Sequence, residues 1–433
     1  MLNLLSYKYK KWGFYMEQKL LNFNRIMSNF STKLVGGFVP MIVYKYAPTH
    51  KLQLALLTII IQYFLSFLFG VILKPLLIKK PQLFLFLRVV PIIIYEVLLM
   101  FIVRNTLICV IGIGVAYSIS YAFKYIPTEV LFAYVNATKK QGTGKQLAIT
   151  KTLEQLSIIL GVVIGGVALD YLDMRIMIVV SIVLYLIGAI PQLIYYLCTM
   201  KRRKINQEYA SYAHIALKEH SNDINFANKV SKKIRIIYSL FYFLQESIQA
   251  IYILIPLYTY TLTGMFTYSA VATAIFDGVY GVGCLIAGKL NNKKDLTVFA
   301  SICGVVVGLL GISLVFIRAN YIWVIYIICF IMAICYSFAY FFMYDRMLKK
   351  SKIVGRNTTC VINRINMFFL STCFVASFGL ISLPLVFCIG GGMSILGGIS
   401  VPYIEERTRR ILVDHLQDNE IKTTGKMFFF KKK

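Results

Sequence analysis

Residues 156–175 read "LSIILGVVIGGVALDYLDMR", an apolar run that ends in a short polar segment. Ser157, Gly161, Gly165 and Ala168 are spaced by four, four and three residues, which places them on one face of an α-helix. Small side chains let two helix backbones approach closely inside a membrane. The stretch therefore predicts a membrane-spanning helix that packs tightly against another helix.

The rest of the chain has the composition of a protein with many membrane spans. It has 433 residues, of which 58% are hydrophobic, and its mean hydropathy is +0.71. Its apolar runs are long enough to cross about 30 Å of hydrocarbon repeatedly, which excludes a soluble globular protein. About twelve spans of roughly twenty residues are predicted. They are centred near Val35, Phe64, Ile94, Val115, Gly161, Leu184, Ile251, Phe276, Gly308, Ile331, Leu370 and Gly392.

Positive charge is concentrated in every second loop. The formal net charge is +28, and lysines and arginines gather in segments such as 79–80, 139–145, 201–204 and 346–356. The alternate loops, such as "DYLDMR" at 170–175, carry few basic residues. This pattern is typical of a multi-pass protein of the cytoplasmic membrane with both termini in the cytoplasm. The charge therefore indicates membrane lipids as partners, and no nucleic acid.

One long polar interruption divides the spans into two groups of six. We predict an all-α polytopic membrane protein with about twelve transmembrane helices in two six-helix bundles. The segment "MEQKLLNFNRI" ahead of the first span is amphipathic and not typical of a cleavable signal, so no processing is expected. The predicted parts are a cytoplasmic N-terminal segment at 1–21, a first bundle at 22–200, a cytoplasmic linker at 201–234, a second bundle at 235–403 and a basic cytoplasmic tail at 404–433.

Polar residues recur at helical spacing on spans one, four, seven and ten. A helix in lipid turns apolar groups outward, so a polar stripe marks a face turned toward protein or water. The regular recurrence of such spans is typical of a transporter built from repeats. We predict a substrate-binding cavity lined by members of these stripes: Lys33, Tyr117, Tyr121, Lys124, Gln245, Glu246, Gln249, Tyr252 and Tyr340. The alternative is that these side chains only hydrogen-bond between packed helices or belong to the interfacial aromatic belt.

Asp277 lies in the eighth span, in "AIFDGVYGVGCL" at 274–285. It shares a helix face with Ala270, Ala274, Gly281, Cys284 and Gly288. Because the fifth span has a similar face, we predict that these two helices pack on each other where the bundles meet. The residues predicted for this seam are Asp277, Ser157, Gly161 and Gly165. We expect Asp277 to hydrogen-bond with Ser157 and to serve coupling; a permanently protonated, structural Asp277 is the alternative.

Other charges also fall inside predicted spans, where each costs at least about 2.5 kcal/mol unless it is paired or hydrated. Our hypothesis is that Lys33 and Lys124 of the first bundle face Glu246 of the second. Such an ion pair would be replaced by a polar or anionic substrate. A permanent, structural bridge is the alternative. Glu96 has apolar helical neighbours and is expected to lie against another helix.

Two spans resemble helices of the major facilitator superfamily of secondary transporters. Residues 156–175 resemble its fifth-helix motif, with Gly161, Gly165 and Gly166 in place. Val162 stands where antiporters of the family usually carry proline. In the fourth span, "IGIGVA" matches the glycine pattern, but Ile108 occupies the position where proton antiporters often carry arginine. These departures argue against a proton-driven antiport mechanism.

Two basic loops are similar to the signature loops of the same family. "GVILKPLLIKK" at 70–80 has Lys74 where an aspartate is expected, and "GKLNNKK" at 288–294 has Asn292 at the acidic position. We predict gates that include these loops and the eleventh span, with Gly70, Lys74, Lys79, Gly288, Asn292 and Arg364 as members. Ordinary lipid contacts by helix-end charges are the alternative.

The resemblance implies two pseudosymmetric bundles that rock about a central site lined by helices one, four, seven and ten. The predicted function is secondary active transport of a small polar or amphipathic organic solute by alternating access, with export favoured over uptake. The implied partners are a small-molecule substrate and a coupling ion, H⁺ or Na⁺, and the protein is expected to be a monomer. A lipid-linked oligosaccharide flippase is the alternative, and a membrane-embedded transferase is a weaker one.

No catalytic residue, cofactor or metal site is predicted. The nine cysteines are scattered without a CxxC pair, and His50, His214, His220 and His415 all lie in predicted loops or the tail. The sequence has no GxxxxGK[ST] loop, so ATP hydrolysis by this chain is not expected.

Overall fold

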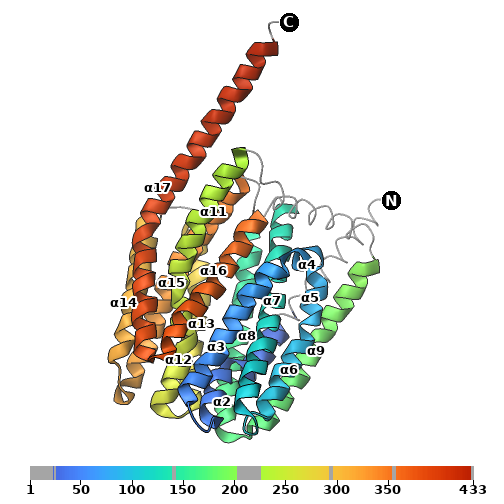
Figure 1. The fold of residues 1–433 in the computed structure, drawn as a ribbon, viewed down its shortest axis with the longest axis vertical. Coiled ribbons are helices and arrows are strands. Elements are labelled where there is room, and N and C mark those ends of the chain that lie inside the picture. Colours follow the sequence, from blue (N-terminus) through green and yellow to red (C-terminus); the bar gives the residue numbers. More distant parts are fainter. Residues whose placement is uncertain are drawn as a thin grey trace.

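The computed structural model describes residues 23, 26–138, 143–201, 226–291, 296–353 and 357–430. Within these ranges every regular element is a helix. The helices run side by side and form one elongated body, from which the last helix projects (Figure 1). We call the end from which it projects the tail end and the opposite end the distal end. The predicted all-α fold class is confirmed.

The first bundle contains the helices up to Lys201. They are the helix 26–35 with η1 (Gly36–Phe38) and α2 (Val39–Tyr46), then α3 (Lys51–Ile72), α4 (Lys74–Lys79), α5 (Pro81–Leu87), α6 (Val89–Met100), α7 (Thr106–Thr138), α8 (Thr143–Tyr171) and α9 (Met174–Lys201).

The second bundle follows residues 202–225, which lie outside the described ranges. Its helices are α11 (Phe226–Gln245), α12 (Ser247–Thr263), α13 (Phe266–Asn291), α14 (Thr297–Ser313) with η2 (Leu314–Phe316), η3 (Ala319–Tyr321), α15 (Ile322–Ile353), α16 (Asn357–Ser377) with η4 (Phe378–Leu380), and α17 (Leu383–Phe430). The predicted boundaries at 234 and 403 fall inside α11 and α17, so both helices extend across them.

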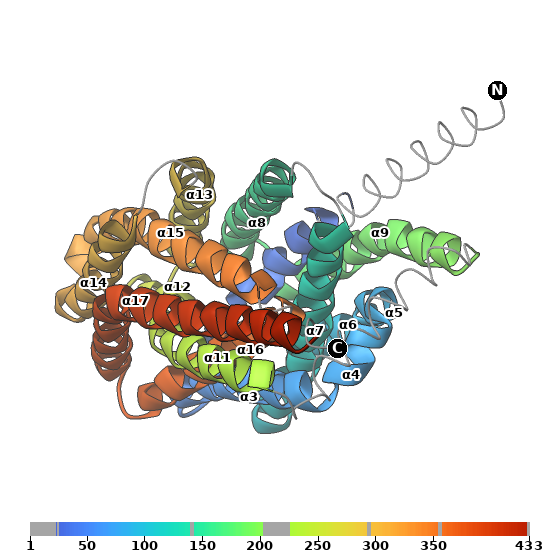
Figure 2. The same ribbon diagram turned by 90° about the horizontal axis from the view of Figure 1, so that it is seen from above.

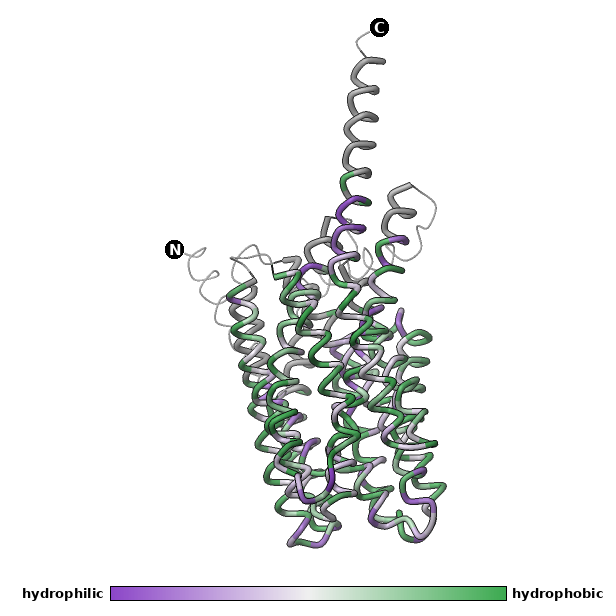
Figure 3. The backbone as a smooth tube through the Cα atoms, turned by 90° about the vertical axis from the view of Figure 1, so that its left-hand side faces the viewer, coloured by the Kyte–Doolittle hydropathy of each residue, from purple (hydrophilic) through white to green (hydrophobic). Residues whose placement is uncertain are grey.

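Eleven helices among the described residues are long and apolar enough to cross a membrane. Consecutive α-helices form one span at Ile26–Tyr46, Pro81–Met100 and Lys232–Thr263. α16 is not among the eleven, and it carries Arg364 and Asn366, but it packs on α3, α11 and α12 and completes a set of twelve. Hydrophobic residues dominate along the bundle and hydrophilic ones gather near its ends (Figure 3).

The two bundles meet along two seams. α8 packs against α13 and α3 packs against α16, which joins one helix of each bundle in both cases. Seen from above, α8 and α13 stand next to each other on one side of the molecule, and α3 and α16 lie on the other (Figure 2). The sequence-based prediction that the fifth and eighth spans pack together is therefore correct.

The first span is broken in the middle. Pro40 has no N–H, so it cannot donate to the carbonyl of Gly36, which a regular helix would require. The chain instead forms the 3₁₀ turn Gly36–Phe38, and the hydroxyl of Tyr117 on α7 donates to the Gly36 oxygen at 3.1 Å. The break thus leaves a backbone acceptor at membrane depth, and a side chain of a neighbouring span satisfies it.

The seventh span, the equivalent span of the second bundle, is also broken, at a point farther from its distal end. α11 ends at Gln245 and α12 begins at Ser247, with Glu246 between them. The Gln249 N–H donates to the Glu246 carbonyl at 2.9 Å, three residues back instead of four. Interrupted helices in equivalent spans of two repeats are typical of the binding region of a transporter.

The last helix is fixed to the second bundle by glycines. A Cβ on Gly391 of α17 would overlap the carbonyl oxygen of Gly308 on α14, and one on Gly398 would overlap the backbone near Gly304. The two backbones therefore approach as closely as small residues allow. Beyond this contact α17 continues as one helix to Phe430, well outside the bundle (Figure 1).

Candidate functional site

Asp277 of the second bundle forms its hydrogen bond with a predicted substrate-binding residue. The hydroxyl of Tyr252 on α12 donates to Asp277 Oδ2 at 2.6 Å, and the Tyr252 ring stacks on Phe276 with centroids 4.3 Å apart. Ser157, the partner expected from sequence, instead donates to the carbonyl of Glu154 in its own helix. The predicted hydrogen bond between Asp277 and Ser157 is thus not formed.

The first bundle presents a lysine to the same carboxylate. Lys33, on the helix 26–35, is near enough for its charge to act on Asp277, although the two do not form a salt bridge. Tyr121 and Tyr125 of α7 lie 5.2 Å apart between ring centroids, and Tyr125 contacts Phe368 and Phe369 of the second bundle at 6.2 and 6.1 Å. We call these five residues (Lys33, Tyr121, Tyr125, Tyr252 and Asp277) the central cluster. It includes a lysine of one bundle and a carboxyl group of the other, on the two sides of the interface.

Lys124 lies beside the central cluster and is bound within the first bundle. Its ammonium group donates to Asn29 Oδ1 at 2.8 Å and lies 5.5 Å from the centre of the Tyr125 ring. Asn29 belongs to the broken first span, one turn before Lys33. The contact therefore ties the fourth span to the half of the first span that precedes the break.

Glu246 is paired with an arginine of its own bundle. Arg364 Nε on α16 lies 3.3 Å from Glu246 Oε1, and the hydroxyl of Tyr336 on α15 donates to Oε2 at 3.0 Å. Gln249 Nε2 donates to the same hydroxyl at 2.7 Å. The hypothesis that Glu246 pairs with Lys33 or Lys124 is therefore not borne out in this structure, where Asp277 is the carboxylate near a lysine.

Two tyrosine rings hold the arginine from its other side. The Arg364 guanidinium lies 4.8 Å from the centre of the Tyr340 ring and 4.7 Å from that of Tyr344, within the range of cation–π attraction. We call Glu246, Gln249, Tyr336, Tyr340 and Arg364 the Glu246 cluster. Tyr336 also lies near Phe276 and Tyr280, so a row of rings connects this cluster with the central cluster.

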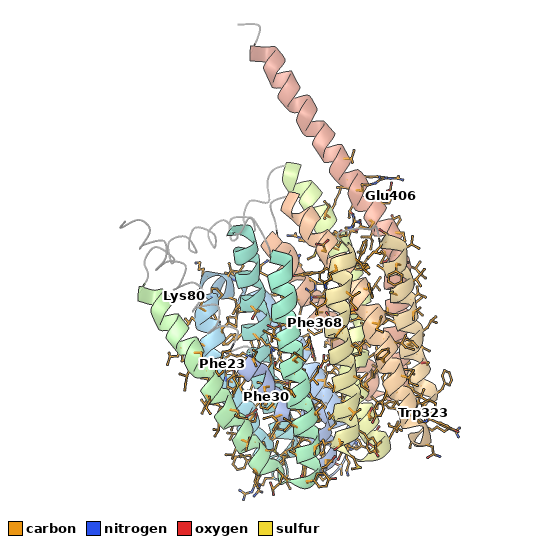
Figure 4. The ribbon with its side chains drawn as sticks, turned by 180° about the vertical axis from the view of Figure 1, so that it is seen from behind. Phe23, Phe30, Lys80, Trp323, Phe368 and Glu406 are labelled. Carbon is orange, nitrogen blue, oxygen red and sulfur yellow. The ribbon has the colours of Figure 1, made fainter. Side chains whose placement is uncertain are left out.

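The facing wall of the first bundle is also aromatic. Tyr117, Tyr121 and Tyr125 follow one another along α7 with ring centroids 5.0 and 5.2 Å apart. Tyr63 of α3 contacts Tyr121 at 5.8 Å and Phe368 of α16 at 5.6 Å. Phe368 lies between the two bundles (Figure 4). Aromatic side chains from both bundles therefore meet around the charged groups.

Gln245 is the predicted binding residue that the structure places elsewhere. Its Cβ faces Gly397 of α17, and its side-chain oxygen is buried without a hydrogen-bond partner. The break at Glu246 explains the difference, because it changes the helical phase between Gln245 and the residues that follow. Gln249 lies beside Glu246, since both side chains bond the Tyr336 hydroxyl.

The predicted seam glycines contact a different helix. A Cβ on Gly161 or Gly165 would overlap the backbone of Phe30 or Leu34 in the first span, so these two glycines admit the broken helix and do not face α13. Gly166 lies on the seam itself, where an added Cβ would overlap that of Ala270. The glycines of this motif therefore pack against two different helices, the first span and α13.

The predicted gate residues do not gather at one place. Gly70 faces Asn366 on the α3–α16 seam, and Gly288 faces the ring of Phe341 on α15. Lys74 is buried at the start of α4 and Lys79 is exposed at its end. Arg364 belongs to the Glu246 cluster. Asn292 lies outside the described residues.

The sequence model of one family, the Major Facilitator Superfamily, matches residues 130–359, more than half of the chain. The chain belongs to this superfamily. It is accordingly a multi-pass secondary transporter and not an enzyme. No curated protein sequence matches the chain.

Solved transporter structures share the superfamily fold with this chain. A crystal structure of a D-xylose–proton symporter matches with a TM-score of 0.61 and 11% identity, covering 90% of this chain and 97% of that one. The xylose transporter XylE from E. coli, in a partially occluded inward open conformation, gives 0.59 and 13% over 89% and 98%. A POT family transporter in complex with 5-aminolevulinic acid gives 0.56 and 14% over 89% and 96%.

This member of the superfamily also buries charge away from the bundle interface. Glu96 lies against α9, where the Ser181 hydroxyl donates to its Oε1 at 2.7 Å, as expected from its apolar surroundings. Arg88, between α5 and α6, donates to the hydroxyls of Ser120 at 3.1 Å and Ser28 at 3.0 Å. Sequence reasoning missed Arg88, although its position within an apolar span was a usable signal.

The structure adds Tyr336, Asn29 and Tyr125 to the residues predicted for the site. Tyr336 and Asn29 belong to the polar stripes of spans ten and one, and that pattern could have included them. Tyr125 follows Lys124 directly, and its position against α16 depends on how the bundles are joined. Among the described residues, no group of three or more His, Cys, Asp or Glu side chains could hold a metal ion.

Proposed function

We propose that this transporter moves a small polar or amphipathic organic solute across the cytoplasmic membrane by alternating access. The observation that supports this most directly is the position of the two broken spans. The breaks at Gly36–Phe38 and Glu246 fall in matching helices of the two bundles, and the central and Glu246 clusters lie beside them. Interrupted helices supply both polar backbone groups and a hinge at membrane depth.

The proposed orientation puts the tail end in the cytoplasm. Basic residues of the connecting segments gather at that end, as at Lys79 and Lys80 after α3. The distal connections are shorter and less basic, which is the expected bias for external loops. The proposed functional unit is a monomer, because one chain supplies both bundles and both clusters.

The proposed substrate seat is the aromatic and charged region between the bundles. Tyr121, Tyr125 and Tyr252 offer ring faces and hydroxyls, while Lys33 and Asp277 offer one charge of each sign. Such a mixture suits a polar organic molecule with an apolar part. Because a substrate here would contact both bundles, its binding would affect their relative position.

The proposed coupling element is the pair formed by Asp277 and Lys33. The two residues come from different bundles, and the cation of one is within reach of the other. A proton or Na⁺ that neutralises the carboxylate would weaken this attraction and favour separation of the bundles. Proton coupling is named for the D-xylose symporter to which the fold is similar, and it enters here as part of the proposal. We retain export as the proposed direction.

The test is transport by purified protein in liposomes with an imposed pH or Na⁺ gradient and a panel of metabolites and dyes. Asp277→Asn should abolish gradient-driven accumulation while leaving exchange of the same solute. Asp173→Asn is the matched control, since Asp173 is exposed and its side chain accepts a hydrogen bond from the N–H of Arg175, two residues further along the chain. If Asp277→Asn accumulates solute like the wild type, the coupling role is wrong. If no gradient drives any flux, the transport proposal itself fails.

A flippase for lipid-linked oligosaccharides would need basic side chains along a groove open to lipid. A groove of about 420 Å³ lies between α13 and α15, and it is lined by Ala274, Ile275, Gly278, Val279, Tyr326, Ile327 and Phe330. None of these residues is charged, whereas Lys33 and Lys124 face the other bundle or their own. The observation therefore favours transport of a soluble solute.

A further inference from the structure

A single carboxylate joins the two bundles at their distal end. Asp170, in the last turn of α8, accepts three hydrogen bonds from the start of α13. Its Oδ1 accepts from the N–H of Phe266 at 2.9 Å. Its Oδ2 accepts from the N–H of Thr267 at 2.8 Å and from the Thr267 hydroxyl at 2.6 Å.

These hydrogen bonds replace a local helix cap. The first N–H groups of a helix have no acceptor within the helix, and a residue just before the helix usually supplies one. The chain enters α13 through Gly264 in a left-handed turn with φ of 71°, and Asp170 supplies the acceptor from the other bundle. A carboxylate at this place also interacts favourably with the helix dipole. The N-terminus of α13 is therefore capped only while the bundles are in contact here.

Aromatic side chains close the same end around this contact. The ring of Phe38 meets that of Phe266 edge-on at 5.8 Å, and Tyr44 meets Tyr260 at 6.1 Å. In each pair the first ring belongs to the first bundle and the second ring to the second bundle. One helical turn further into the membrane, close packing of Gly166 against Ala270 also holds the two bundles together.

We propose that Asp170 is the latch of the distal gate and that its three hydrogen bonds must break whenever the transporter opens toward that end. In the proposed orientation this is the outward-open step. The latch stabilises the state that is closed at the distal end. Its removal therefore shifts the population of transporter molecules toward the state that is open at that end. The proposal concerns the gate and does not depend on the identity of the solute.

Hydrogen–deuterium exchange of the full-length protein in lipid nanodiscs tests the latch without a known substrate. Asp170→Asn keeps the size of the side chain, but its NH₂ group cannot accept the donors that now face Oδ2. Loss of the charged acceptor should speed exchange at Phe266 and Thr267 by about tenfold. At the same time, exchange should slow at the tail end, near Gly70 and Asn366, because rocking open at one end closes the other.

Two further variants separate a latch from a simple cap. Thr267→Val removes only the hydroxyl contact and should shift both ends in the same directions by a smaller factor. Asp173→Asn, three residues after Asp170 and outside α8, should leave exchange at both ends unchanged. Faster exchange at α13 without slower exchange at the tail end would reduce Asp170 to a local cap and overturn the proposal. Faster exchange along every helix in both Asp170→Asn and Thr267→Val would also overturn it, since it would show a role in folding.

Discussion

Tyr252 donates a 2.6 Å hydrogen bond to Asp277 from the neighbouring helix of the same bundle. This bond fixes one oxygen of the carboxylate, and the charge of Lys33 in the other bundle acts on it without a salt bridge. A buried carboxylate held in this way has a defined orientation toward the bundle interface. The relationship explains how a residue on the small-residue face of α13 can also take part in the polar site.

Replacing Tyr252 by Phe should slow solute transport in liposomes. The change removes only the hydroxyl and keeps the ring stacked on Phe276. A hydrogen bond to a charged group contributes about 1.5–3 kcal/mol, so the initial rate should fall by about tenfold or more. Tyr258→Phe is the control on the same helix, because its hydroxyl bonds the carbonyls of Leu314 and Ile317 away from the site. Equal rates for both variants would contradict the assigned role.

Neutralising Lys33 and Asp277 together should destabilise the protein less than neutralising either residue alone. Lys33→Met leaves Asp277 without its cation, and Asp277→Asn leaves the lysine without its anion. Each single change should lower the melting temperature of the purified protein, and the double variant should recover about half of the loss or more. Strictly additive losses would show that the two charges do not interact. Coupled transport should remain absent in the double variant.

Removing one partner of the Glu246–Arg364 pair should strongly destabilise the protein. Both side chains are largely buried, with 3% and 12% of their surface exposed, and removing one member of a buried ion pair costs about 3–5 kcal/mol. Glu246→Gln should therefore lower the melting temperature clearly. Glu406→Gln is the control, because Glu406 forms an exposed pair with Arg410 on α17, and it should cause no measurable shift. A stable Glu246→Gln protein would show that the pair is dispensable.

A single methyl group at Gly166 should disturb the seam. The new Cβ would overlap that of Ala270, and overpacking of this kind costs about 1–3 kcal/mol. Gly392→Ala is the control, since nothing lies within 4 Å of a Cβ there, and alanine stabilises a helix relative to glycine by about 0.5–1 kcal/mol. Thermal unfolding should thus move in opposite directions for the two variants. A stabilising Gly166→Ala would contradict the close approach of α8 and α13.

The fold could be predicted from sequence because it follows from hydrophobic length and loop charge. Both signals are local, and they identify the spans without knowledge of any contact. The packing of the fifth on the eighth span was also predictable, since small residues at helical spacing show where two backbones can meet. The partners of individual glycines were not, because Gly161 and Gly166 point to different neighbours and the sequence gives no rotation angle between helices.

The site could be predicted to the level of helices, with errors at the level of contacts. The stripes on spans one, four, seven and ten identified most of both clusters. Gln245 was assigned wrongly because a stripe assumes one continuous helix, and the break at Glu246 shifts its phase. The carboxylate that approaches a lysine was also misassigned: which of Glu246 and Asp277 meets Lys33 depends on the depth and rotation of three helices at once.

The projecting end of α17 would convert a rotation of the second bundle into a displacement of the helix tip that can be measured outside the membrane. Because glycines lock α17 to α14, the helix must turn with its bundle as a lever arm. From Ile411 to Phe430 it extends by about 28 Å at about 1.5 Å per residue. A rotation of roughly 10° would therefore move its tip by about 5 Å at this length. A fluorophore attached there would report each rocking cycle from outside the membrane, far from any residue of the site.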